Sequence, residues 1–223
     1  MKKVFVSLLV IGVWSWATVA FASKDFEIRG KMLVSEKPAF TLILSSEFRS
    51  VYSFSHENPG ESSVTRVHFF VKTKGKQVEE MFIIQISDRT NPAAGPIAVE
   101  PLKPYTEKRM YMKDKIKKGD LVIDYLIQLM AWNPDAASLQ PLVKKGIIIP
   151  SQWALQGQFL FVYQGEHAVF IRYSKDINAF GLKISEEGKG WERGSISGNE
   201  KKVYEDFQKT FIEMMNSIQI KKP

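Results

Sequence analysis

Aromatic residues and a single arginine are concentrated in residues 158–173, the stretch whose composition best suits ligand binding. Two apolar runs flank Gly165-Glu166, and a Gly-X pair is typical of a two-residue type II′ hairpin turn. Such a turn pairs Gln164 with His167, which assigns each side chain of the hairpin to a face. In this register one face carries Phe159, Phe161, Tyr163, Phe170 and Arg172. If partly open, this face is an aromatic groove with one guanidinium, suited to an anionic or aromatic ligand. Aromatic side chains more commonly form a second layer of the core.

Glu166 and His167, at the tip of the same hairpin, could bind a metal ion or move a proton. A hairpin tip is solvated, however, and a catalytic pair needs a cleft that shifts its pKa values. The other histidines, His56 and His68, have no partner at the spacing of metal ligands. We therefore expect no metal site and no cofactor. A hydrolase that uses Glu166 and His167 beside the proline-rich segment 89–104 is the alternative to a non-enzymatic protein.

A basic segment, residues 103–118, holds seven lysine and arginine residues against Glu107 and Asp114. It could contact anionic lipid headgroups, an envelope polysaccharide or an acidic protein. The candidate contact residues are Lys108, Arg109, Lys113, Lys115, Lys117 and Lys118. A solvated helix face is the simpler interpretation, because runs of charge commonly face water.

The first 22 residues have the pattern of a secretory signal peptide: a basic start, an apolar run over 4–19 and an Ala-x-Ala exit at 20–22. The rival interpretation is an uncleaved anchor, since the run is near the length of a membrane span. Cleavage would leave residues 23–223 as one domain without a transmembrane segment. The chain has no cysteine, which excludes disulfides, thiolate metal sites and a cysteine-linked lipid anchor. The predicted location is the periplasm or the exterior, where nucleic acid is not expected as a partner despite the net charge of +7.

Hydrophobic periodicity predicts the elements that must position these residues. Period-two patterns indicate strands at 26–34, 40–44, 65–73, 78–87 and 180–184. Residues 121–131 fit a strand or a helix, and a strand is favoured because alternate positions are apolar. Short helices are predicted over 106–118 and after Asp135, and a capping box at Ser197 and Glu200 opens a longer amphipathic helix. The predicted fold class is α+β: a mainly antiparallel sheet built from hairpins, packed by this C-terminal helix and by shorter helices.

The order of these elements is informative. An early hairpin holds Phe40-Thr-Leu-Ile-Leu-Ser-Ser-Glu-Phe48, two further hairpins follow, and the closing helix ends Phe211-Ile-Glu-Met-Met-Asn-Ser-Ile218. This order resembles the PsbP-like family and covers most of residues 23–223, with Ser45 standing where that family often has proline. The resemblance implies a sandwich of antiparallel sheet and helices, and a mostly non-enzymatic function, as in photosystem II accessory proteins and bacterial envelope proteins. We therefore expect a periplasmic or secreted binding or accessory protein whose partner is a protein or a small molecule.

Overall fold

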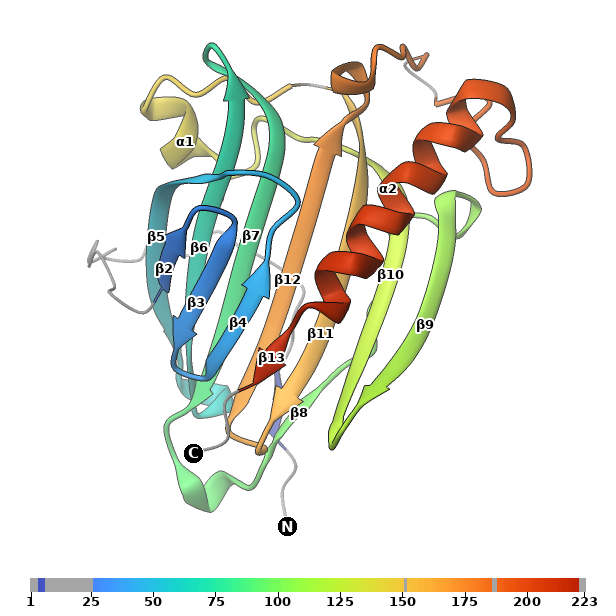
Figure 1. The fold of residues 1–223 in the computed structure, drawn as a ribbon. Coiled ribbons are helices and arrows are strands. Elements are labelled where there is room, and N and C mark those ends of the chain that lie inside the picture. Colours follow the sequence, from blue (N-terminus) through green and yellow to red (C-terminus); the bar gives the residue numbers. More distant parts are fainter. Residues whose placement is uncertain (1–3, 7–25, 151, 186–187, 221–223) are drawn as a thin grey trace.

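The computed structural model describes residues 4–6, 26–150, 152–185 and 188–220. Within these residues the fold is α+β, with antiparallel sheets holding most of the regular structure and helices few. Seven of the described strands form one large sheet, and a smaller sheet packs against it together with a long helix (Figure 1). Residues 1–3 and 7–22, which belong to the predicted signal peptide, lie outside the described residues.

Neighbouring strands of the large sheet are all antiparallel. From edge to edge the strands are β5 (Arg49–Asn58), β6 (Ser63–Lys74), β7 (Gln77–Arg89), β12 (His167–Asp176), β11 (Trp153–Tyr163), β10 (Leu121–Ala131) and β9 (Met110–Lys118). The hairpin predicted from strands at 65–73 and 78–87 is confirmed as β6 and β7. The preference for a strand at 121–131 is also confirmed, as β10.

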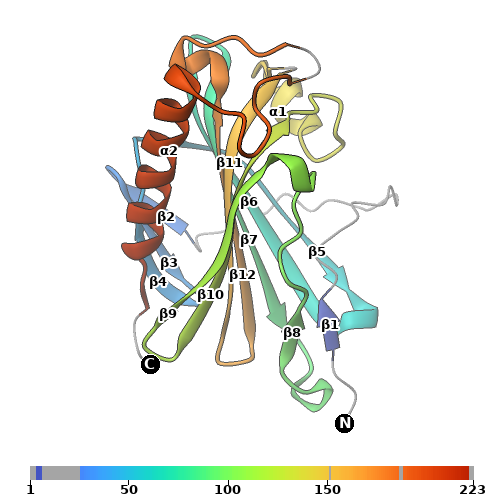
Figure 2. The same cartoon turned by 90° about the vertical axis from the view of Figure 1, so that its right-hand side faces the viewer.

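The small sheet and the C-terminal helix together cover one face of the large sheet, which we call the first face (Figures 1 and 2). The order of the small sheet is β13 (Gln219–Ile220), β4 (Ala39–Ile43), β3 (Met32–Glu36) and β2 (Phe26–Arg29). The helix α2 (Gly198–Asn216) leads directly into β13, which pairs with β4. The single strand predicted at 26–34 is a hairpin instead, because Gly30 takes a left-handed φ of 61° and turns the chain.

Packing of α2 on the first face is set by one very close approach. Phe211 is fully buried over Gly157, and a Cβ at position 157 would stand 2.7 Å from Cγ of the Phe211 ring. Only glycine fits at such a distance. Phe207 stacks between Phe211 and Tyr173, with ring planes parallel within 3°. The apolar face predicted for this helix is confirmed by its buried residues, Phe207, Phe211, Met214 and Met215.

The register of the central hairpin, β11 with β12, differs by one residue from the prediction. The turn contains three residues rather than two, with Gln164 and Gly165 both left-handed, at φ values of 54° and 68°. Tyr163 therefore pairs with His167, and each later pair shifts with it. A shift of one residue exchanges which side chains share a face, so the predicted grouping along this hairpin is wrong.

The opposite face of the large sheet, the second face, is covered mainly by irregular chain (Figure 2). Residues 90–109, which we call the strap, cover part of β10, β11 and β12 and include β8 (Ile97–Val99). β8 pairs in parallel with β1 (Val4–Val6), which falls within the predicted signal peptide. The short helix α1 (Gln140–Lys144) and the segments around it cover part of β6 and β7. The predicted irregular segment 89–104 thus also contains a short strand.

Two further predicted elements are wrong, and a third begins later than predicted. Residues 106–118 form a 3-10 turn at Glu107–Arg109 and then strand β9, because pairing with β10 overrides the helical pattern. Residues 180–184 are described and hold no strand; the first of them ends a 3-10 turn, Ile177–Phe180. The short helix predicted after Asp135 begins only at Gln140.

We predict that Gly157→Ala lowers the free energy of unfolding by about 1–3 kcal/mol, because the added methyl must displace the Phe211 ring or the helix that carries it. Urea denaturation measures the change. Gly60→Ala is the control, since a Cβ there meets no atom within 4 Å, and it should change stability little. The double variant Gly157→Ala/Phe211→Leu should lose less than the sum of the two single losses. Additive losses would contradict the proposed contact.

Candidate functional site

A row of polar side chains crosses the middle of the second face, and we call it the polar seam. Its members are Gln85, Gln128, Gln156, Gln158, Arg172 and Ser174. They come from β7, β10, β11 and β12, and the strand register places them side by side: Arg172 pairs with Gln158, and Gln156 with both Gln128 and Ser174. Residues that face each other across antiparallel strands project from the same side of the sheet. The seam is therefore one continuous polar surface.

Hydrogen bonds satisfy one end of the polar seam. The backbone N–H of Tyr105, in the strap, donates to Oε1 of Gln128, and Nε2 of Gln128 donates to Oε1 of Gln156 at 3.0 Å. Nε2 of Gln158 donates to the same oxygen, while Nε2 of Gln156 donates to Oγ of Ser174 at 3.0 Å. Buried amides are normally paired in this way.

The other end of the seam holds a guanidinium without a partner. Within the described residues no acceptor takes a hydrogen bond from Arg172, and its Nε is buried. The centroid of the Phe170 ring lies 5.0 Å from Cζ of Arg172. Burial lowers the pKa of Arg172 to about 10. Gln85, the diagonal neighbour on β7, likewise has an amide to which the described residues offer no hydrogen-bond partner.

Apolar side chains form the two walls of this end of the seam. Towards the strap lies a cluster of Leu102, Leu126, Leu160 and Phe170. Towards α1 lies a second cluster, which includes Val67, Phe69, Ile83, Leu142 and Ile147. Arg172 pairs directly with Ile83 and sits where the two clusters meet. Arg172 and Gln85 are half-buried, so solvent reaches the seam at this point.

The five residues predicted to form an aromatic groove do not share a face. Phe159 and Phe161 are buried in the first-face core under the small sheet and α2, and Tyr163 packs at the margin of that core. Phe170 and Arg172 project from the second face. The predicted aromatic groove is therefore a misgrouping caused by the turn of three residues: Phe159, Phe161 and Tyr163 share the first face, and Phe170 and Arg172 share the second.

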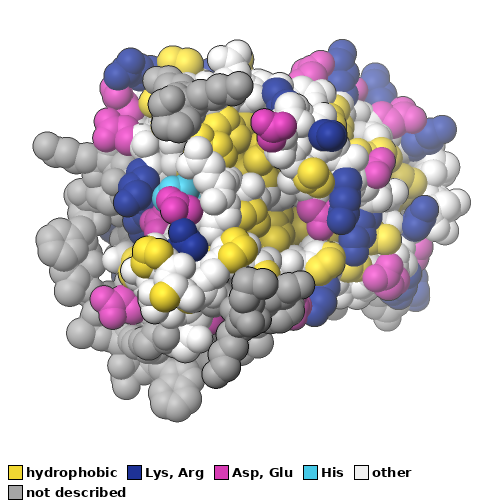
Figure 3. All heavy atoms as spheres, turned by 90° about the horizontal axis from the view of Figure 1, so that it is seen from below, with side chains coloured by type: hydrophobic (Ala, Val, Ile, Leu, Met, Phe, Trp, Pro, Cys, Tyr) yellow, Lys and Arg dark blue, Asp and Glu magenta, His cyan; other side chains and the backbone are white. Residues whose placement is uncertain are grey.

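Glu166 and His167 have different surroundings, because Glu166 lies in the turn and His167 begins strand β12. Glu166 forms an ion pair with Arg89 at 2.9 Å, and Nδ1 of His167 lies 2.6 Å from Oδ1 of Asp88. Arg66 binds the other oxygen of Asp88 and the carbonyl of Lys37, which ties the large sheet to the small one. Charged side chains of both signs and a histidine gather at this end of the molecule (Figure 3). These contacts account for Asp88 and His167 as structural groups.

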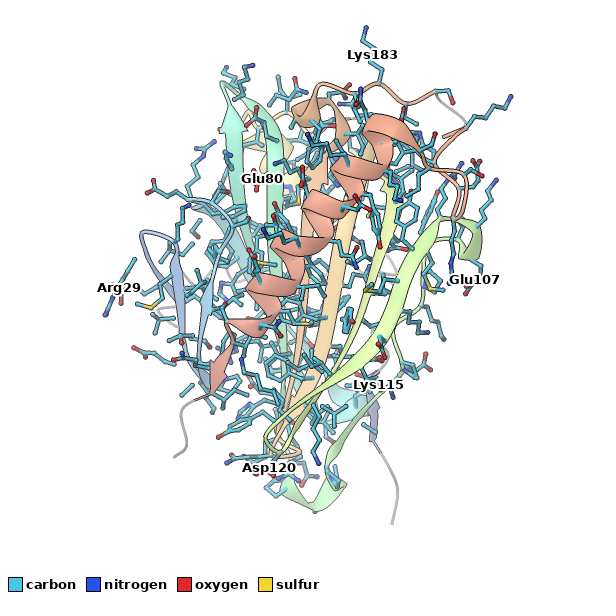
Figure 4. The ribbon with its side chains drawn as sticks, turned by 45° about the vertical axis from the view of Figure 1, so that its right-hand side comes forward. Arg29, Glu80, Glu107, Lys115, Asp120 and Lys183 are labelled. Carbon is cyan, nitrogen blue, oxygen red and sulfur yellow. The ribbon has the colours of Figure 1, made fainter. Side chains whose placement is uncertain are left out.

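The basic segment is divided by the strand that it forms. Lys113, Lys115 and Lys117 are exposed and project from the same face of the edge strand β9, where Figure 4 labels Lys115. Arg109 is only 6% exposed and lies under the ring of Trp153, 4.2 Å from its centroid. Lys118 donates to the carbonyl of Asn216 at the end of α2. Lys108 is exposed but stands apart in the 3-10 turn, so the predicted surface reduces to the three lysines of β9.

A buried carboxylate that the sequence analysis did not select is the centre of the first-face polar contacts. Glu80 is 3% exposed and accepts hydrogen bonds from Lys72 at 3.0 Å, Ser46 at 3.1 Å and the Tyr173 hydroxyl at 2.8 Å. Figure 4 labels it between the large sheet and the layer that covers the first face. Burial raises the pKa of Glu80, but the hydrogen bonds from Lys72 and Tyr173 and the charge of Lys175 outweigh it and hold the pKa below its usual value.

Nothing in the described parts of the chain resembles a metal site, since no three His, Asp or Glu side chains there gather as ligands. None of the described helices is long and apolar enough to cross a membrane. No protein-family model, curated protein or solved structure matches the chain.

We predict that Glu80→Gln lowers the free energy of unfolding by about 1–3 kcal/mol at pH 7, because several donors lose a charged acceptor. Since the folded-state pKa of Glu80 lies below its unfolded value of about 4.3, the stabilisation is fully present above that pH and is lost as pH falls through the folded pKa. The difference between wild type and variant in urea titrations should therefore shrink below about pH 4.3.

Exposed Glu36→Gln is the control for this prediction and should have little effect on stability at either pH. A stability difference between wild type and Glu80→Gln that stayed constant from pH 7 to pH 3 would contradict the assignment of Glu80 as an ionised acceptor.

Proposed function

We propose that this chain is a non-enzymatic binding protein of the periplasm or exterior, and that it holds an anionic ligand at Arg172 on the second face. The observation that carries the proposal is the unpartnered guanidinium at the open end of the polar seam. The signal-peptide pattern at 1–22 supports the location. The resemblance to the PsbP-like family supports a non-enzymatic function and stays a prediction.

Taking the charge of Arg172 out of water costs free energy. Proteins normally pair a buried charge with an opposite one, because an unpaired ion loses its hydration without compensation. Arg172 lacks such a partner among the described residues, and the depressed pKa reflects that loss. A bound anion would supply the missing partner, and a guanidinium binds carboxylate or phosphate oxygens through two parallel hydrogen bonds.

The contacts of Glu166 and His167 favour a non-enzymatic protein over a hydrolase. Glu166 is engaged by Arg89, and His167 is held by Asp88 within a cluster that joins the two sheets. Each side chain is thus held by a partner of its own, which argues against their acting together as an acid and base pair.

We predict that anionic small molecules co-purify with the wild-type protein and are lost from Arg172→Met. Mass spectrometry of the material released by denaturation makes the comparison. Arg49→Met is the matched control, because Arg49 is an exposed arginine on β5, remote from the seam. The same anions in wild type and Arg172→Met would contradict the proposed site, and so would the absence of any bound anion from the wild-type protein.

A second candidate function is contact with an anionic envelope surface through β9. The observation in its favour is the row of Lys113, Lys115 and Lys117, which are exposed and regularly spaced on one side of an edge strand. Lysines on an edge strand also prevent edge-to-edge association, which explains them without a ligand.

We predict that, if β9 contacts such a surface, changing Lys113, Lys115 and Lys117 to Gln weakens binding to anionic vesicles about a hundredfold, since each lysine contributes roughly 1 kcal/mol. Co-sedimentation at low and moderate salt measures the effect. The control variant changes Lys201, Lys202 and Lys209 of α2, which alters net charge equally. Equal binding by the two triple variants would mean that β9 has no specific function in surface contact.

A further inference from the structure

We infer that the ligand held at Arg172 is a monoanionic carboxylate with an apolar body, an inference that rests on the proposed function. Three properties of the open end of the seam carry it. These are the number of positive charges within reach, the donors beside the guanidinium, and the chemistry of the walls.

Arg172 is the one charged member of the polar seam, which favours a ligand with a single negative charge. Along the row that contains Arg172, the strand pairing runs through Gln158 and Leu126 to Lys113. Lys113 is therefore three strand spacings, or about 14 Å, from Arg172. Beyond a distance of this kind solvent screens most of the interaction, so Lys113 cannot neutralise a second charge at the site. A phosphate dianion would leave one charge uncompensated in a partly buried place, whereas a carboxylate would not.

The donors around the site suit a carboxylate in a defined orientation. The Phe170 ring lies against one side of the guanidinium, at 5.0 Å from its carbon, and so restricts the direction in which the N–H groups point. Gln85 projects from β7 on the same face, diagonally across from Arg172, with an amide that no described residue uses. One carboxylate can accept two hydrogen bonds from the guanidinium and a third from this amide.

The walls determine what the rest of the ligand must be. Phe170 and Ile83 flank Arg172 on the two sides and are 7% and 8% exposed, whereas the deeper Leu126 and Leu160 are at most 1% exposed. On these two sides the guanidinium is therefore lined by apolar side chains. Leu102 of the strap extends this lining over Leu160 and Phe170. An aliphatic or aryl group would gain burial against these side chains.

The test uses isothermal titration calorimetry of the purified protein at pH 8 with three probes: decanoate, decyl phosphate and decan-1-ol. At this pH the phosphate monoester is largely a dianion, and the alcohol keeps the apolar body without charge. Decanoate should bind the wild-type protein roughly tenfold or more tightly than either of the other probes. Arg172→Met should lose a similar factor for decanoate and leave decan-1-ol unchanged. Arg172→Lys should lie between, because an ammonium keeps the charge but not the paired donors.

A second variant, Gln85→Leu, tests the site even if Arg172→Met does not fold. Gln85→Leu keeps the guanidinium and the apolar walls, and it should weaken decanoate binding a few-fold while leaving the thermal midpoint near that of wild type. Circular dichroism of each variant checks the fold.

Two kinds of failure are distinguishable. Tighter binding of decyl phosphate than of decanoate, still dependent on Arg172, would overturn the monoanionic carboxylate and leave the proposed function standing. Equal decanoate binding by wild type and Arg172→Met would overturn the site and with it the proposed function. Absence of binding by all three probes would overturn the apolar body, while anions that co-purify in an Arg172-dependent way would still support the proposed function.

Discussion

The contact between Phe211 and Gly157 is the constraint on which the arrangement of the first face depends. Because no Cβ stands at position 157, α2 lies directly on β11 rather than a side-chain layer above it. The helix then carries Phe207 onto Tyr173, whose hydroxyl reaches the buried carboxylate of Glu80. Its C-terminal end delivers the chain to β13 and so to the small sheet. One close approach thus links the helix, the central strands and the second sheet.

The second face is built differently, because two separate segments cover it. The strap and the α1 segment each bring their own apolar side chains, which form separate clusters on the sheet rather than one. The polar seam lies between the strap and the α1 segment, where neither apolar cluster extends over it. The charge of Arg172 in this row is unfavourable for the empty protein. Replacing Arg172 by a neutral or apolar residue is expected to stabilise the fold. Ligand binding therefore explains the presence of this arginine better than stability does.

The sequence correctly predicted those elements in which the spacing of apolar residues matches the face that is buried in the fold. The alternation of β10 and the apolar stripe of α2 are of this kind, because each pattern matches the face that is finally buried. The helix predicted at 106–118 is wrong, because the residues of this segment fit the period of a strand as well as that of a helix. Pairing with β10 makes the segment a strand. Glu80 could not be found locally, since Ser46 and Tyr173 reach it from positions 34 and 93 residues away. Within each strand the predicted groove was grouped correctly, and the error lay in joining the residues of β11 to those of β12.

The turn between β11 and β12 limits which sequence changes this chain can accept in evolution. Because Gln164, Gly165 and Glu166 set the register, the turn decides that Arg172 shares a face with Gln158 and not with Phe159. Substitutions within the turn that keep the left-handed φ values would leave this arrangement intact. A deletion or insertion of one residue would instead turn Arg172 into the apolar core or expel Phe159 and Phe161 from it. Related sequences that keep the seam should therefore vary in the composition of this turn but not in its length.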